Sequence, residues 1–243
     1  MMRNRIHVSL GTTNDSSPES ENGWAAARIA ARAQTYNGGM AGTGGPEWTI
    51  REDAGVAVLL ALYLRQAIGV RSPDELPHLR GVPARTGPER GEEAQARLER
   101  QWREYWAMTV EPQAHPSPVP LELVDDFETM IALPAQGMAD LQAAIVPHAR
   151  ASLAYARAEN ARYSSESGGR PGVSYRAYAS AIAEHERRVG RRAHSFELNV
   201  QVLPLTQRGV WWIGSLTVAV TDGLRGDVVA FDAAIHPIIA ELA

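Results

Sequence analysis

The sequence predicts an α+β protein, with a mainly helical first part and a carboxy-terminal αββα unit built on a small antiparallel sheet. Three observations predict this class. Apolar residues recur at helical spacing over 92–106 and 138–163, whereas the stretch FELNVQV (196–202) alternates apolar and polar residues as a strand does. Asp227 then precedes a last periodic apolar stretch, in the position of a helix cap.

The length and the loop composition predict three parts. The 243 residues suffice for a sizeable core in one large domain or two small ones. We expect a flexible or docking arm over 1–46, a mainly helical part over 47–166 and the αββα unit over 174–243. The last two parts could form one compact domain.

The composition excludes several kinds of chemistry. The chain has no cysteine, which excludes disulfides and cysteine-ligated zinc. All 24 basic residues are arginine, which excludes a Schiff-base or P-loop lysine. GC-rich coding, as in many bacteria, explains the missing lysine, and avoidance of lysine modification is the alternative. The net charge of −4 argues against broad nucleic-acid binding.

The apolar runs are short. The longest, residues 54–64, cannot cross a bilayer, and the amino terminus lacks the apolar length of a signal peptide. We therefore expect a cytoplasmic protein that does not bind membranes.

The arm and the first long helix have recognisable signals. Residues 5–10 (RIHVSL) predict a short strand and 24–36 a short helix, both within Ser-, Asn- and Gly-rich sequence. Thr49 and Glu52 have the spacing of a capping box, which predicts a helix from there to about Ile68.

Two further helices have buried stripes. The first, from Glu92 to about Trp106, presents one apolar stripe: Leu98, Trp102, Tyr105 and Trp106. The second, from about Met138 to Tyr163, should kink at Pro147 and has these inward residues: Leu141, Ile145, Ala149, Leu153 and Ala156. Between them, the prolines of 111–123 predict an extended chain.

The last 70 residues predict helix, strand, strand and helix. A helix capped by Ser174 ends near Gly190, and a final helix capped by Asp227 should bend at Pro237. Between them, a three-residue turn at 207–209 would join two antiparallel strands.

This hairpin register predicts an apolar patch on the outer face near the turn. The patch consists of Leu203, Leu205, Trp211 and Ile213. Another part of the same chain could cover it, or it could be a surface for a protein partner or for self-association.

Other candidate sites are less specific. Four arginines near the end of the 174–190 helix could contact an anion or an acidic partner: Arg187, Arg188, Arg191 and Arg192. We find no catalytic motif, no metal-ligand spacing and no cofactor motif. A hydrolase would have to assemble its site from scattered groups such as Asp125, Asp126, His148 and His185.

The sequence therefore predicts a non-enzymatic binding or scaffolding protein that self-associates. One alternative is the hydrolase assembled from residues distant in sequence. Another is a structural component of a phage or mobile element, in which long arms order on assembly.

Overall fold

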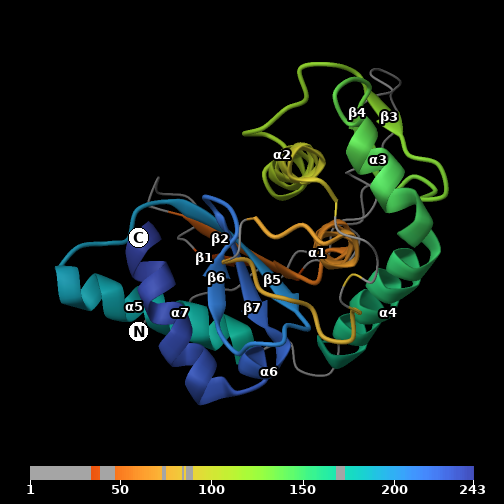
Figure 1. Cartoon of the computed structure of the whole chain (residues 1–243). Helices are drawn as coiled ribbons and strands as arrows, with labels where there is room; N and C mark the ends of the chain where they lie inside the picture. Colours follow the sequence, from red (N-terminus) through yellow and green to blue (C-terminus); the bar gives the residue numbers. More distant parts are fainter. Residues whose placement is uncertain (1–33, 39–46, 73–74, 84, 86–89, 168–172) are drawn as a thin grey trace, which may run out of the picture.

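The computed structural model describes residues 34–38, 47–72, 75–83, 85, 90–167 and 173–243 (Figure 1). Within these ranges the main sheet has five strands in the order β1-β2-β5-β7-β6. They are β1 (Gln34–Gly38), β2 (Trp48–Asp53), β5 (Phe196–Leu203), β6 (Val210–Trp212) and β7 (Thr217–Thr221). The central strands β2, β5 and β7 are parallel to one another, and β1 and β6 are antiparallel edge strands. The α+β class is confirmed, but the prediction of a purely antiparallel sheet is wrong.

Helices cover both faces of the sheet (Figure 1). One layer contains α1 (Val56–Ile68), α2 (Glu92–Val110), α3 (Ala139–Ile145) and α4 (Ala149–Ser167). The other contains α5 (Val173–Val189) and α7 (Val228–Leu242), which pack against each other, and the short α6 (Asp222–Arg225) precedes α7. No helix in the described ranges is both long and apolar enough to cross a membrane.

The first helical layer is held together around α1. This helix is apolar on nearly every side, and its residues 58–62 are buried, as its sequence predicts. Trp102 of α2 is fully buried, stacks on Trp106 and donates from Nε1 to the main-chain oxygen of Ala61 at 3.3 Å. The predicted stripe of α2 is therefore its packing face.

The predicted hairpin between the last strands is wrong. On the side of β5 away from β2 its neighbour is β7, which is parallel to it, with Val200 beside Val218 and Val202 beside Val220. β6 lies on the far side of β7 and runs antiparallel to it, and the chain turns between them at 213–216. The segment predicted as one strand is therefore two.

The chain after β5 pairs with a segment far away in sequence instead of turning back. Arg80 N donates to Pro204 O at 2.8 Å, and Thr206 N donates to His78 O at 2.8 Å. Leu79 and Leu205 form an isolated antiparallel bridge between these segments. Because Pro204 O and Thr206 N find these partners outside the sheet, the chain does not need to turn back along β5.

The predicted capping box at Thr49 and Glu52 is also wrong. Residues 48–53 form β2, paired with β1 on one side and β5 on the other, and the helix begins at Val56. A capping box satisfies two main-chain donors, whereas a strand with two neighbours satisfies a ladder on both sides. The tertiary pairing therefore overrides the local signal.

Other predicted elements are confirmed. The helix predicted over 138–163 is broken at Pro147, which lies in a 3₁₀ turn (Val146–His148, η1) between α3 and α4. Asp227 caps α7, accepting a hydrogen bond from Ala230 N at 3.2 Å. At Pro237 α7 is not interrupted and continues to Leu242, so a bend there stays a prediction.

The predictions for the arm are tested over a few residues. The strand predicted at 5–10 lies outside the described residues, as does most of the helix predicted at 24–36. Residues 34–36 belong to β1 and not to a helix, because they pair with β2. At this point the arm is part of the sheet.

Candidate functional site

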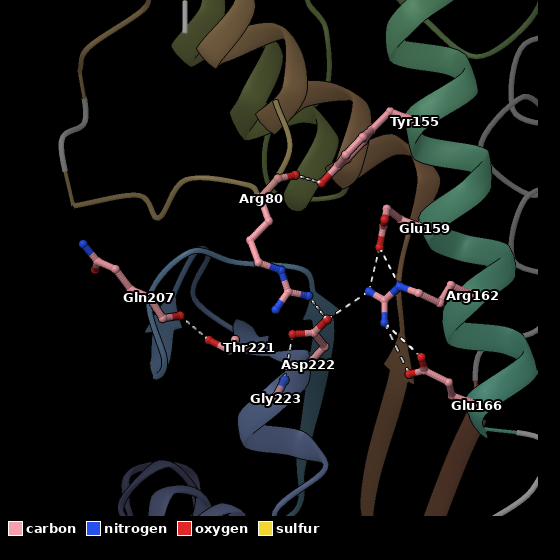
Figure 2. A network of polar contacts seen from close by, with 9 residues as sticks. All are labelled: Arg80, Tyr155, Glu159, Arg162, Glu166, Gln207, Thr221, Asp222 and Gly223. Carbon is pink, nitrogen blue, oxygen red and sulfur yellow. Dashed lines mark hydrogen bonds and ion pairs between the residues drawn. The ribbon is translucent and has the colours of Figure 1, made fainter. Parts of the chain in front are cut away.

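In open sheets with parallel strands, ligands bind where the carboxyl ends of neighbouring strands meet. Here β2 ends at Asp53, β5 passes through Gln201, and β7 is followed by Asp222. The carboxy-terminal half of α4 passes beside this edge and contributes polar side chains to it (Figure 2). This edge is therefore the first place to look for a site.

Asp222 is the centre of a network of polar contacts (Figure 2). Its Oδ2 accepts hydrogen bonds from Arg162 Nη2 at 2.9 Å and from Arg80 Nη2, and its Oδ1 accepts one from Gly223 N at 2.7 Å. Its side chain is only 13% exposed. Two guanidinium groups and a main-chain amide therefore pair with the oxygens of this carboxylate.

The other side chains of the network also have hydrogen-bond or ion-pair partners. Arg162 also pairs with Glu159 at 2.6 Å and Glu166 at 3.1 Å. Burial acts to lower the pKa of Arg162, but the hydrogen bonds to these carboxylates and their negative charges together outweigh burial and raise it. Tyr155 donates to Arg80 O at 2.8 Å, and burial together with the charge of Glu159 raises the pKa of its phenol. The network joins α4, the segment around Arg80 and the start of α6, and we assign it a structural role.

A second polar group surrounds the turn from β2 into α1. Gln201 Oε1 accepts from Gly55 N at 2.8 Å, and Asn160 Nδ2 donates to Ala54 O at 2.8 Å. Asp53 accepts from Ala54 N at 2.7 Å. Burial raises the pKa of Asp53, and the hydrogen bond from Ala54 lowers it by less. These contacts hold the main chain of residues 54–55.

We expect replacement of Asp53 by asparagine to stabilise the protein at neutral pH. The amide keeps an acceptor for Ala54 N and removes a charge that burial disfavours. Because the pKa of Asp53 is higher in the folded chain than in the unfolded chain, wild-type stability falls as pH rises through the folded pKa. The gain measured by urea unfolding should be largest above that pKa and shrink towards acidic pH. A gain that did not depend on pH would contradict this account.

One buried carboxylate was missed by the sequence analysis. Glu52 is fully buried and accepts hydrogen bonds from Arg225 Nε at 2.7 Å, Tyr178 OH at 2.8 Å and Tyr163 OH at 3.2 Å. Glu52 lies on the same face of β2 as the buried Ile50. This alternation is the only signal in the sequence that could have indicated the burial of Glu52. The group joins α4, α5 and α6 to the sheet.

The predicted apolar patch is not on the surface. Leu203 is 0% exposed, Leu205 1% and Ile213 8%, and only Trp211 is partly accessible. The indole of Trp211 packs over Gly209, where a Cβ atom would lie 3.0 Å from the ring. The patch depended on the wrong hairpin register. In the observed topology the same chain covers the three aliphatic residues of the patch, which was one of the two alternatives expected from the sequence.

The four arginines of the other prediction are exposed at the end of α5 and in the turn after it. Arg191 Nη1 lies 2.7 Å from His194 Nε2, and Arg188 Nη2 lies 3.5 Å from His185 Nδ1. Binding of an anion or acidic partner by these arginines stays a prediction.

The scattered hydrolase groups are not gathered into one site. Asp125 and Asp126 are exposed in the β3–β4 loop, His148 lies in η1, and His185 is buried on α5, across the sheet. Across the described ranges, no group of three or more His, Asp or Glu side chains could hold a metal ion.

A surface of a different kind lies on a small two-stranded ribbon, β3 (Leu121–Leu123) and β4 (Ala132–Pro134). Leu133 faces inward and is 3% exposed. Leu121 and Leu123 lie on the opposite face and are 52% and 53% exposed. Two neighbouring leucines exposed by more than half form an apolar surface that the described chain does not cover.

The outer edge of β3 is also open, since β4 is its only strand neighbour in the described part of the chain. Ala135 N donates to Pro120 O and Val124 N to Ile131 O, each at 3.0 Å. Because main-chain groups of successive residues point to opposite sides of a strand, those of Leu121 and Leu123 point away from β4. An added strand could pair with them.

The loop that joins β3 to β4 is acidic. Asp125 and Asp126 are exposed and make no ion pair with a described residue, whereas Glu128 pairs with Arg157 of α4. Asp126 (φ 67°) and Glu128 (φ 57°) have left-handed backbone conformations, which are uncommon outside glycine. We call the ribbon and this loop, residues 121–134, the acidic ribbon.

Comparison with known proteins adds no family to this description. The chain matches no protein-family model, and the searches of curated proteins and of solved structures found no match.

Proposed function

We propose that the protein is a non-enzymatic binding protein that self-associates through the acidic ribbon. The observation that carries this proposal is the pair of exposed leucines on a strand whose outward main-chain groups are open. Such an edge binds an extended segment by β-augmentation: the main chain supplies affinity, and alternate side chains supply specificity.

The chemistry of the surface specifies its partner. The exposed leucines favour a partner with aliphatic side chains at alternate positions. Asp125 and Asp126, which make no ion pair with a described residue, favour nearby basic residues in that partner. Residues 3–10 of this chain, RNRIHVSL, have both features: Arg3 and Arg5 are basic, and three alternate residues are aliphatic. These three are Ile6, Val8 and Leu10.

We commit to residues 3–10 of a second copy as the occupant. A strand of three residues makes a weak contact. If two copies exchange their amino-terminal segments, formation of the first contact makes the second contact intramolecular. The affinity of the two contacts together is then higher than that of either one alone. Residues 1–33 lie outside the described part of the chain, and they are long enough, at about 3.3 Å per residue, to reach another molecule.

A charge on the exposed face should weaken this association. Leu123→Glu in the full chain should make self-association roughly a hundredfold weaker, because a carboxylate would replace a central apolar contact. Its thermal stability should stay close to wild type, since Leu123 is already half exposed. Size-exclusion chromatography with light scattering measures the mass. Val229→Glu is the matched control, because Val229 is 81% exposed on the distant α7.

A charge exchange tests the occupant. Asp125→Arg with Asp126→Arg should weaken the dimer, and adding Arg3→Glu with Arg5→Glu should restore it. A wild-type chain that is monomeric at all concentrations, or a dimer that Leu123→Glu leaves intact, overturns the proposal. Rings or tubes far heavier than two chains would contradict a closed dimer. They would favour the alternative that the protein is a structural component of a larger assembly.

A further inference from the structure

One edge of the main sheet is open at β6, whose only strand neighbour in the described part of the chain is β7. Gly209 O accepts a hydrogen bond from Thr221 N at 3.1 Å, and Ile213 N donates to Thr217 O at 2.9 Å. Gly209 and Ile213 therefore direct main-chain groups towards β7. Because the main-chain groups of successive residues alternate in direction, these two bonds determine the direction for every residue between them.

The outward main-chain groups of β6 belong to Val210 and Trp212. Trp211, midway between Gly209 and Ile213, faces β7 as they do, so its two neighbours face the other way. In the described part of the chain, no group is hydrogen-bonded to the main-chain N–H or C=O of Val210 or Trp212. An edge strand with unpaired groups of this kind can be continued by a further strand.

The side chains of this edge include two neighbouring tryptophans. Trp211 and Trp212 project to opposite faces of the sheet, and both are only partly buried. Tryptophan is a common anchor of protein interfaces, because one indole buries a large apolar area. Two partly exposed tryptophans on an open edge therefore favour a protein partner at β6.

The edge is self-complementary. If a two-fold axis passes through the strand at Trp211, β6 pairs antiparallel with its own copy and Val210 lies opposite Trp212 of the second copy. Residues opposite each other with outward groups exchange both of their N–H···O=C bonds. The two Trp211 residues form the central pair without hydrogen bonds, in which Cα atoms are about 4.5 Å apart and side chains share one face. Aromatic pairs in this position stabilise antiparallel strands.

The charges at the two ends of β6 complement each other in this arrangement. Arg208 precedes the strand, and its side chain is 54% exposed although it pairs with Asp227 at 2.5 Å. Glu111 lies at the other end, where its Oε1 accepts from Ser215 N at 2.6 Å. Antiparallel pairing places residue 208 of one copy opposite residue 214 of the other. Each end of the contact then has a guanidinium from one copy and a carboxylate from the other, which is favourable.

We propose that two copies of the chain pair antiparallel through β6 and continue the main sheet from one copy into the other. This inference rests on the self-association proposed above and adds a second contact between the same two copies. Residues 11–33 span up to about 75 Å when extended, so residues 3–10 of each copy can still reach the acidic ribbon of the other. Two short contacts between the same copies bind more tightly together than either one alone.

Residue-resolved hydrogen exchange of the full chain, followed by NMR in a dilute and in a concentrated sample, tests this pairing. The amides of Val210 and Trp212 should exchange roughly tenfold more slowly in the concentrated sample, because they become hydrogen-bonded in the dimer. The amide of Trp211 faces β7 and should be protected in both samples. The amides of Leu121 and Leu123 report the ribbon contact in the same spectra.

Light scattering measures whether the concentrated sample contains dimers. Dimers in which the amides of Val210 and Trp212 exchange as fast as in the monomer overturn the pairing through β6. If exchange at Leu121 and Leu123 is slower in those dimers, the ribbon contact stands. Slower exchange at β6 alone supports this pairing and overturns the ribbon contact. A chain that is monomeric in both samples overturns both proposals.

Two substitutions at one position separate the main chain from the side chain. Val210→Pro removes the outward N–H, and proline is tolerated at the first residue of an edge strand. It should weaken self-association roughly thirtyfold, because each copy loses one hydrogen bond of the pairing. Val210→Ala keeps the N–H and is the matched control, which should stay within about threefold of wild type.

Thermal melting checks that each variant is folded. Trp211→Ala removes the central aromatic pair, should weaken association roughly tenfold, and supplies a folded variant if Val210→Pro does not fold. Wild-type association in a folded Trp211→Ala and a folded Val210→Pro overturns the pairing through β6.

Discussion

Replacement of Glu52 by alanine is expected to lower the free energy of unfolding by about 3–5 kcal/mol, the usual result of removing one partner of a buried ion pair. Glu52 is fully buried, and Arg225, its partner at 2.7 Å, is 15% exposed. The substitution leaves the mostly buried Arg225 guanidinium without this carboxylate, and it removes the acceptor of two tyrosine hydroxyl groups.

Urea unfolding followed by circular dichroism measures this loss. The control is Glu197→Ala, which breaks a 2.7 Å pair with Arg51 whose side chains are 56% and 42% exposed. That substitution should cost no more than about 1 kcal/mol, because exposed ion pairs contribute little. Similar losses in the two variants would show that the buried group does not hold α4, α5 and α6 on the sheet.

Replacement of Leu203 by alanine is expected to cost about 2–5 kcal/mol of stability, the range for truncating a buried leucine. Leu203 ends β5 and is 0% exposed. The hairpin register expected from the sequence would instead place it on an outer surface, where truncation leaves stability nearly unchanged and weakens association. The result therefore distinguishes the two topologies.

Leu216→Ala is the matched control for this measurement, because Leu216 is 42% exposed in the turn between β6 and β7. It should change stability by no more than about 0.5 kcal/mol. A loss for Leu203→Ala as small as this, together with weaker self-association, would restore the hairpin and its patch.

The elements that were predicted correctly depend on local patterns. The buried stripe of α2 follows from apolar spacing, the break between α3 and α4 from Pro147, and the start of α7 from the cap at Asp227. Each pattern spans a few residues of one segment, and the main chain of a helix is satisfied within the segment itself.

The candidate surfaces were predicted less well. The alternation of β5 correctly assigned its buried face, but an alternating strand has the same faces whether its neighbour is parallel or antiparallel. The residues after β5 were predicted to form a hairpin turn. No local signal shows that residues 204–206 instead pair with residues 78–80. The predicted patch was lost with that turn. The exposed leucines of β3 were not recognised, because a proline-rich extended segment does not reveal which strand pairs with it.

The sequence by itself determined the buried stripe of α2, the break at Pro147, the cap of α7 and the apolar side of β5. Only the tertiary structure decided which strands are neighbours, where the leucines after β5 lie, and what surrounds Glu52. Three of the hydrogen-bond partners of Glu52 lie 111, 126 and 173 residues further along the chain. The physical reason is the distance along the chain over which each interaction acts. Periodicity and helix caps involve residues a few positions apart. Strand pairing and the neutralisation of a buried charge depend on groups that meet only when the chain is folded.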